Sequence, residues 1–301
     1  MEIDCKELKR LARERMGMTV PKFWLVTLIY FLMTTGLSCV ADFIPLAASD
    51  SPLGITTTAL FLGILLTLYT TVVDFGYTLW TLWAFRRLEP GMYSLLQGFS
   101  VAGRVILLQL GILVRMIGWI FLLSFALSAL LLFSMPLLMT GFPLLMILLT
   151  SVLYAAMWAI QLRYALAPYL LADRPDDGAA MAINRSVILM RGWKWELFKL
   201  EFSFIGWHLL ELVLSGGVLL AFLIPSGLFS ALMSMDMTAL QELVNTAAAN
   251  PVQTLLSSLA SLPVLLWLLP YRGVSVAGFY DARQRLYLAT EQEQTPLDPI
   301  S

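Results

Sequence analysis

Charged residues are scarce in this chain, and so are the residues that build metal sites and disulfides. Only 13% of the 301 residues are charged, and the sequence contains two cysteines and one histidine. A soluble domain carries about 25% charged residues, so the low value excludes an ordinary soluble protein. Cys5 precedes the first apolar segment and Cys39 lies near its far end, so we expect them to lie on opposite sides of a membrane and to remain unpaired. A net charge of −1 argues against a nucleic-acid partner, which requires a basic face.

Motifs that carry catalysis or bind cofactors are also missing. The sequence has no zinc-type spacing of cysteine and histidine, no glycine-rich loop for phosphate and no nucleophile elbow. We therefore predict no catalytic set, no metal and no cofactor.

Apolar residues are abundant instead, at 59% of the chain. A helix needs about 20 mostly apolar residues to cross a bilayer. Six segments are long enough, at residues 23–44, 57–82, 108–134, 143–167, 200–224 and 252–271. The pattern predicts an all-α fold, a polytopic membrane helix bundle with six transmembrane helices.

The longest uncharged stretch supports two of these six helices. Between Arg115 and Arg163, 47 residues carry no charge. At about 1.5 Å per residue they form roughly 70 Å of helix, enough to cross a core of about 30 Å twice. Pro136, Gly141 and Pro143 lie near the middle, where we expect a turn.

The 19 lysine and arginine residues alternate strictly between the connections. They lie before the first apolar segment, between or just inside the second and third, around the connection from the fourth to the fifth, and after the sixth; the other three connections contain none. Because positive residues are enriched on the cytoplasmic side, we expect the N-terminus and the C-terminus both to be cytoplasmic. Residues 1–285 then form a single membrane domain, and residues 286–301 a polar tail.

Two short cytoplasmic amphipathic helices are predicted outside the membrane. In residues 3–16, Ile3, Leu8, Leu11 and Ala12 lie among basic residues. Such a helix either binds anionic lipid headgroups or only sets the orientation of the chain in the membrane. We favour the second role.

The second of these helices covers residues 176–191, with Asp176 or Asp177 as its N-cap and Gly192 just past its end. It lies on the membrane surface or packs under the bundle. Its apolar face comprises Ala179, Ala182, Ile183, Ser186, Leu189 and Met190. A further short helix is expected near residues 238–246.

Polar residues inside the fifth apolar segment are the candidate functional site. Glu201, His208, Glu211 and Ser215 fall within about 80° of one another on one continuous helix. Ionisable groups at membrane depth are costly and normally point into the bundle or a wet cavity. The stripe forms either a proton relay, ion site or substrate cavity, or a hydrogen-bonded knot between helices; Glu201 alternatively lies at the interface.

Three more ionisable residues are candidate partners for this stripe. Asp74 lies in the second apolar segment, and Arg115 and Arg163 flank the long uncharged stretch. For both arginines the default role is snorkelling to the inner interface.

An ordered motif runs from residue 164 to residue 207. Its residues are Tyr164, Pro168, Tyr169, Asp173, Pro175, Ala182, Ser186, Met190, Gly192, Lys194, Ser203, Gly206 and Trp207. The tyrosine-rich helix end, Asp-x-Pro turn, Ala-x-x-x-Ser helix, Met-x-Gly-x-Lys segment and Ser-Phe-Ile-Gly-Trp span closely resemble the bacterial family called domain of unknown function nine-seven-five. Pro270, Tyr271, Phe279 and Tyr280 resemble its closing segment.

The resemblance implies a multi-pass protein of the bacterial cell membrane and implies no activity. The motif also reads as a folding signature. Pro175 follows a helix end, Gly192 ends the next helix, Lys194 anchors at the headgroups, and Gly206 permits close helix packing.

Three functions remain open for this integral membrane protein of unknown activity. The first is a non-enzymatic, membrane-organising or partner-binding role, with the lipid bilayer and protein partners or a second copy as its contacts. The second is a small transporter or channel that uses the polar face of the fifth apolar segment. The third is an intramembrane enzyme that acts on lipid.

Overall fold

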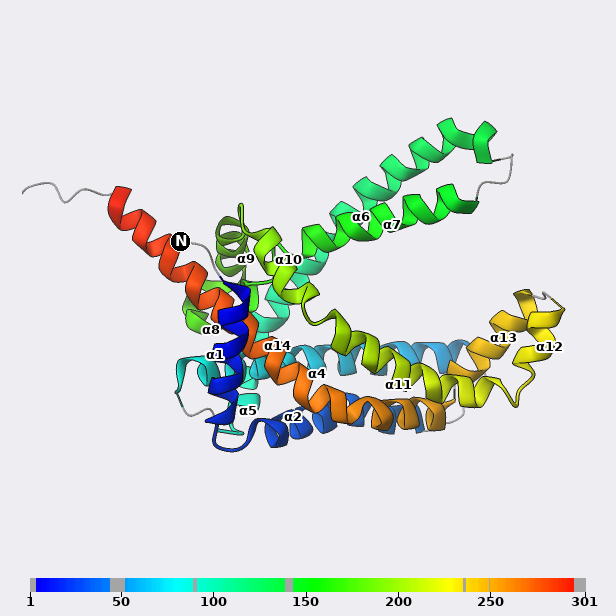
Figure 1. Ribbon diagram of the computed structural model, residues 1–301, viewed down its shortest axis with the longest axis horizontal. Helices are drawn as coiled ribbons and strands as arrows, with labels where there is room; N and C mark the ends of the chain where they lie inside the picture. The colour runs from blue at the N-terminus through cyan, green and yellow to red at the C-terminus, as the bar shows by residue number, and fades with distance from the viewer. Residues whose placement is uncertain are drawn as a thin grey trace, which may run out of the picture.

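The computed structural model describes residues 4–43, 52–88, 91–138, 143–234, 237–248 and 250–294. Every regular element within these ranges is a helix, as Figure 1 shows. The predicted all-α fold is therefore confirmed for the described part of the chain. The predicted turn at Gly141 and the C-terminal end of the polar tail lie outside the described residues.

Long apolar helices make up most of the fold. The first apolar segment comprises α2 (Phe23–Phe31), a π-helical turn η1 (Leu32–Gly36) and α3 (Leu37–Phe43). It is followed by α4 (Pro52–Arg86), α6 (Ala102–Leu138), α7 (Pro143–Gln161) and α11 (Ile205–Leu223). The last helix, α14 (Pro251–Gln294), continues through Pro263 and Pro270.

Within the described residues, five helical segments are long and apolar enough to cross a membrane. They are Phe23–Val40, Leu60–Arg86, Ala102–Ala129, Ile205–Leu223 and Pro251–Thr290. The predicted segment 143–167 forms α7, which ends at Gln161 and is not one of these five. The helical hairpin of α6 and α7 diverges from the group formed by α2, α4, α11 and α14 (Figure 1).

The prediction of one continuous helix over residues 200–224 is wrong. The chain bends between α10 (Lys194–Phe202) and α11. Lys9 donates to the backbone oxygen of Ser203 at 3.3 Å and to its hydroxyl at 3.0 Å. Phe204 is fully buried and packs edge-on against Tyr271, with ring centroids 5.1 Å apart. These contacts with distant residues favour a bend over continued helix.

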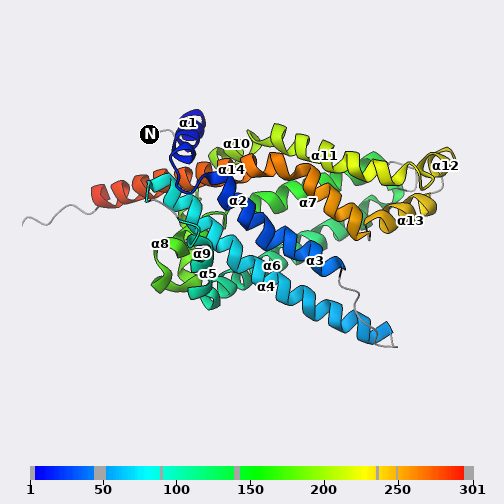
Figure 2. The same ribbon diagram turned by 90° about the horizontal axis from the view of Figure 1, so that it is seen from below.

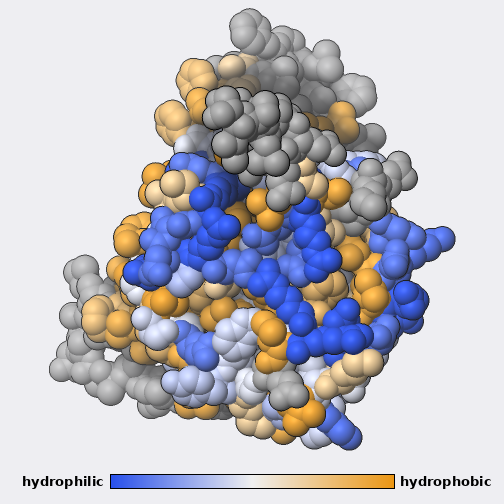
Figure 3. Space-filling view, turned by 90° about the vertical axis from the view of Figure 1, so that its left-hand side faces the viewer, coloured by the Kyte–Doolittle hydropathy of each residue, from blue (hydrophilic) through white to orange (hydrophobic). Residues whose placement is uncertain are grey.

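The core lies at the end of the molecule where the short helices gather. The largest fully buried side chains are Trp80, Tyr280, Phe204 and Phe279. Figure 2 shows α5 (Ser94–Ser100), α8 (Ala167–Asp173) and α9 (Gly178–Leu189) at the same end as α1 (Cys5–Gly17). Hydrophilic side chains gather in a band across this end, with hydrophobic ones between them (Figure 3). At the other end lie α12 (Leu228–Met233) and α13 (Met237–Ala248), and α13 confirms the short helix expected near residues 238–246.

The N-terminal helix packs on protein through its apolar face. Leu8, Ala12 and Met16 of α1 are buried, and the helix contacts α4, α10 and α14. Burial, together with the neighbouring Arg13, lowers the pKa of Lys9 on the same helix. An apolar face that is covered by protein cannot insert among lipid headgroups, so any lipid contact of α1 is left to its exposed basic side chains.

The second predicted cytoplasmic helix is α9, followed after a turn by Gly192 at φ 79°. Ala182, Ile183 and Ser186 are buried on the predicted face, and α9 contacts α6 and α8. Of the two placements open from the sequence, packing under the bundle is the one that these contacts support.

Close crossings fix α4 against its neighbours. A Cβ atom added at Gly76 would overlap the backbone of Leu95, and one added at Gly98 would overlap the Val72 carbonyl. Only glycine allows the backbones of α4 and α5 to approach this closely.

We expect Gly76→Ala to destabilise the protein by about 1–3 kcal/mol, because the added methyl group has no room. The measurement is the thermal unfolding midpoint of detergent-purified protein. Gly63→Ala is the matched control, since a Cβ on this other α4 glycine meets nothing within 4 Å. Equal midpoints for the two variants would contradict the tight crossing.

Candidate functional site

A polar cavity of about 480 Å³ lies where the apolar helices converge. Residues of α2, α4, α6, α7, α8, α10 and α14 line it. The polar lining comprises Tyr30, Asp74, Tyr77, Thr78, Thr81, Gln109, Gln161, Tyr164, Tyr169, Glu201 and Arg272. Contributions from so many helices make this cavity a product of the tertiary fold.

Charged residues of the cavity lie deep within apolar helices. Asp74 precedes Arg86, the last residue of α4, by twelve residues, which is about 18 Å at the helical rise. Arg272 precedes Asp281 on α14 by nine residues, or about 14 Å. Arg86 and Asp281 are hydrogen-bonded to each other. Asp74 and Arg272 therefore both lie toward the N-terminal ends of their helices, measured from this shared contact.

Asp74 lines the cavity, and among the described residues its carboxyl group has one hydrogen-bond donor. The Tyr30 hydroxyl donates to its Oδ1 at 2.7 Å. Tyr30 is held by stacking on Tyr77 with ring centroids 4.3 Å apart, and the Tyr77 hydroxyl lies 3.0 Å from that of Thr27. No lysine or arginine of the described residues forms an ion pair with Asp74. The site therefore holds a carboxyl group without a cationic partner.

The second carboxylate of the cavity is neutralised. Arg272 donates from Nε to Glu201 Oε2 at 2.6 Å and from Nη2 to Oε1 at 3.0 Å. This two-point geometry is the strongest that arginine makes with a carboxylate. Glu201 lies in the last turn of α10 and Arg272 in the middle of α14. The pair joins the two helices and cancels both charges inside the cavity.

His208 and Glu211 lie outside the cavity, on α11. The His208 Nδ1 and Glu211 Oε2 atoms are 3.4 Å apart. Leu223, at the end of α11, is the one buried residue of this helix. The Ser215 hydroxyl donates to the backbone oxygen of Glu211. The predicted stripe is therefore divided: the bend at Ser203 separates Glu201 from the other three residues.

The two candidate arginines do not reach the carboxylates. Arg115 donates to the backbone oxygen of Gly111 in its own helix at 3.1 Å. The guanidinium of Arg163 lies 5.9 Å from the ring of Trp119. Of the six candidate residues, the structure places Asp74 and Glu201 in the cavity.

Hydropathy and the alternation of charge do not single out Arg272, which directly follows the sixth apolar segment and counts there only as one of the basic residues after it. The residues after it supplied a signal: Gly273 to Tyr280 contain no charge. An arginine with apolar residues on both sides is more costly than one at an interface, and it requires a partner such as Glu201.

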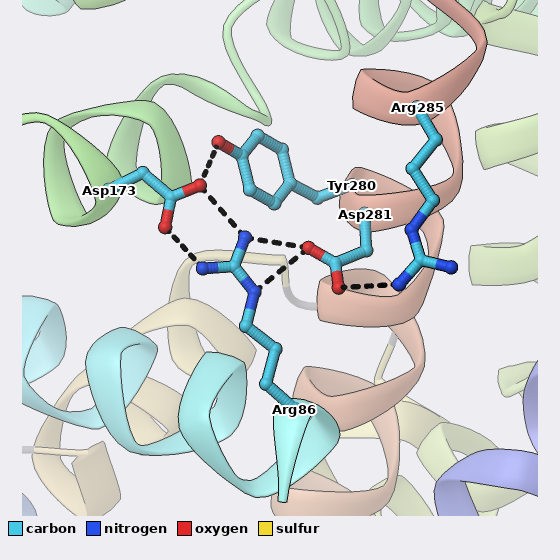
Figure 4. Close-up of polar contacts among 5 residues, drawn as sticks. All are labelled: Arg86, Asp173, Tyr280, Asp281 and Arg285. Carbon is cyan, nitrogen blue, oxygen red and sulfur yellow. Dashed lines mark hydrogen bonds and ion pairs between the residues drawn. The ribbon is translucent and has the colours of Figure 1, made fainter. Parts of the chain in front are cut away.

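A network of charges, separate from the cavity lining, joins three helices (Figure 4). Arg86 binds Asp173 through both terminal nitrogens, with Nη2 at 2.8 Å from Oδ2. The same guanidinium donates to Asp281 from Nη2 at 2.7 Å and from Nε at 3.0 Å. Tyr280 donates to Asp173 at 2.7 Å, and Arg285 lies 4.0 Å from Asp281. Arg86 thereby joins α4, α8 and α14.

Several residues of the sequence motif serve this packing. Asp173 is the acidic residue of the Asp-x-Pro turn, and Pro175 begins the 3-10 helix η2 (Pro175–Asp177). Ser186 is fully buried and donates to the backbone oxygen of Arg163 at 2.9 Å. Met190 is fully buried as well.

Other motif residues line the cavity or lie apart from it. Tyr164, Pro168 and Tyr169 line the cavity. The expectation that Gly206 permits close helix packing is wrong, because a Cβ added there meets nothing within 4 Å. Trp207 is partly exposed on the same helix.

We expect Asp173→Asn to lower the free energy of unfolding by about 2 kcal/mol, because it leaves the Arg86 charge incompletely paired in a largely buried place. The measurement is chemical denaturation in detergent. Asp176→Asn is the matched control: Asp176 pairs with Arg104 while its side chain is 93% exposed, and such surface pairs contribute little. A loss of equal size in both variants would contradict the role of Asp173.

Comparison with known proteins places the chain in one family. Among the curated proteins and among the solved structures, none matches it. A family model described as "Protein of unknown function (DUF975)" matches residues 1–285. This range contains the charge network, the cavity and the whole motif of residues 164–207. The chain therefore belongs to the DUF975 family of proteins of unknown function.

Proposed function

We propose that this protein crosses the bacterial cytoplasmic membrane six times, with both ends in the cytoplasm, and binds a small polar ligand in its central cavity. The alternation of its 19 basic residues supports the orientation. The position of α1 beside α14, at the hydrophilic end, also supports it. The helical hairpin of α6 and α7 supplies the third and fourth crossings.

A binding or transport role is carried by one observation: the cavity contains an unpaired carboxyl group at membrane depth. Ionisable groups in such places are expensive and usually line pathways or ligand sites. A purely structural knot would pair its charges, as Arg272 and Glu201 do. Asp74 has instead only the hydroxyl of Tyr30. The proposal retains the transporter hypothesis and moves its site from the polar face of α11 to the cavity.

Access of water to the cavity tests this proposal. Single cysteines are introduced at Thr78 and Gln109 in a chain with Cys5→Ser and Cys39→Ser, and membranes are treated with a small polar thiol reagent. Thr78 and Gln109 line the cavity, so we expect both cysteines to be labelled.

Val73→Cys is the matched control, because Val73 lies on the same helix as Thr78 and is fully buried. We expect it to remain unlabelled. If the cavity positions react no faster than the Val73 position in folded protein, the cavity is dry and the proposal fails.

A second candidate function, binding of a protein partner, is favoured by α11. His208 and Glu211 expose 45% and 32% of their side chains on an apolar helix. Lipid does not satisfy such groups, whereas a facing helix does. We infer that a second copy of this chain covers this face, because histidine and glutamate on one face are complementary to the same pair on a symmetric partner.

We expect the double variant His208→Ala and Glu211→Ala to reduce self-association, measured by cross-linking in membranes. Val213→Ala is the control: Val213 is 68% exposed and lies about 140° around the helix from His208. A monomeric wild-type protein, or an unchanged oligomer in the double variant, would exclude this interface.

A further inference from the structure

We propose that the cavity takes a ligand with a positively charged ammonium group, which the Asp74 carboxylate holds among aromatic rings. This inference rests on the proposed function of the cavity and names the class of its ligand. Three features of the lining lead to it: its net charge, its aromatic rings and its remaining polar groups.

With Asp74 ionised, the lining carries an excess of one negative charge. Its charged residues are Asp74, Glu201 and Arg272. Glu201 and Arg272 cancel each other through two hydrogen bonds. The carboxylate of Asp74 remains, and its Oδ2 has no hydrogen-bond donor among the described residues. A cation restores neutrality in the cavity, whereas an anion is repelled.

Aromatic side chains contribute to the same lining, and Tyr30 contacts the carboxylate directly. Tyr30, Tyr77, Trp158, Tyr164 and Tyr169 all line the cavity. The faces of aromatic rings attract cations, and cages of such rings recognise methylated and quaternary ammonium groups. An inorganic cation such as Na⁺ would require several oxygen ligands at short distance, whereas among the described residues only the Tyr30 hydroxyl lies within hydrogen-bond distance of the Asp74 carboxylate. The combination of one carboxylate with several rings therefore favours an organic cation over a metal ion.

The rest of the lining suits the uncharged part of such a ligand. Gln109 and Gln161 present exposed amide groups to the cavity, and amides can both donate and accept hydrogen bonds. A volume of about 480 Å³ lies within the range of small-molecule sites. The ammonium group can belong to a free organic amine or to the headgroup of a lipid.

The experiment measures protection of a cysteine in the cavity. Thr78→Cys, one helical turn after Asp74, is placed in the full-length chain with Cys5→Ser and Cys39→Ser, reconstituted in nanodiscs of phosphatidylglycerol. Labelling by the neutral reagent N-ethylmaleimide is followed with tetramethylammonium chloride, or with sodium chloride or sodium phosphate at the same ionic strength. We expect tetramethylammonium to slow labelling by about tenfold or more at saturation, and the two sodium salts to leave it unchanged.

A carboxylate-to-amide change then tests Asp74 itself. We expect Asp74→Asn to weaken the protection by tetramethylammonium at least about tenfold, because the substitution removes a charge-assisted contact. Glu211→Gln makes the same chemical change on α11, outside the cavity, and is expected to keep the protection. Should Asp74→Asn fail to fold, the protection measured with Asp74 intact still decides between a cation and an anion.

The outcomes separate the two proposals. No labelling of Thr78→Cys in folded protein overturns the cavity as a wet site. The cationic ligand is overturned if only phosphate slows labelling. It is also overturned if neither tetramethylammonium nor phosphatidylethanolamine, a lipid with an ammonium headgroup, slows it. In both cases the cavity proposal stands. In nanodiscs that contain phosphatidylethanolamine, protection without any added cation identifies a lipid headgroup as the source; protection only by tetramethylammonium identifies a free cation.

Discussion

The guanidinium of Arg86 is the contact on which the arrangement of the helices depends. It binds two carboxylates, Asp173 on α8 and Asp281 on α14, from the last residue of α4. The Arg86 side chain is 27% exposed, and a charge largely removed from water is tolerated only where its donors are satisfied, so the three helices must meet at this point. Tyr280 completes the network by donating to Asp173.

From the charge network, the contact between α4 and α14 continues along both helices. Thr81 lies against Gly273, and Phe85 against Gly278, where any larger residue would collide with the α4 side chain. The two helices therefore run side by side from the charge network into the apolar region. Farther along them lie Asp74 and Arg272, so the network sets the positions of two cavity walls.

The same arrangement explains why one end of the molecule is a packed core and the other is open. Short helices cover α4 and α14 around the charge network, whereas α6 and α11 leave most of their surfaces uncovered by protein. The cavity lies at the junction, where the α6–α7 hairpin departs from the other helices (Figure 1).

The sequence by itself determined the apolar helices, the two short amphipathic helices and the position of Gly192, because these depend on neighbours only a few residues away. It also singled out Asp74 and Glu201 as costly residues. Only the tertiary structure decided that Arg272 is the partner of Glu201, that the chain bends at Ser203, and that His208 lies apart. Each of these depends on a contact between residues far apart in the chain, and hydropathy, which sums local preferences, carries no information about such pairs.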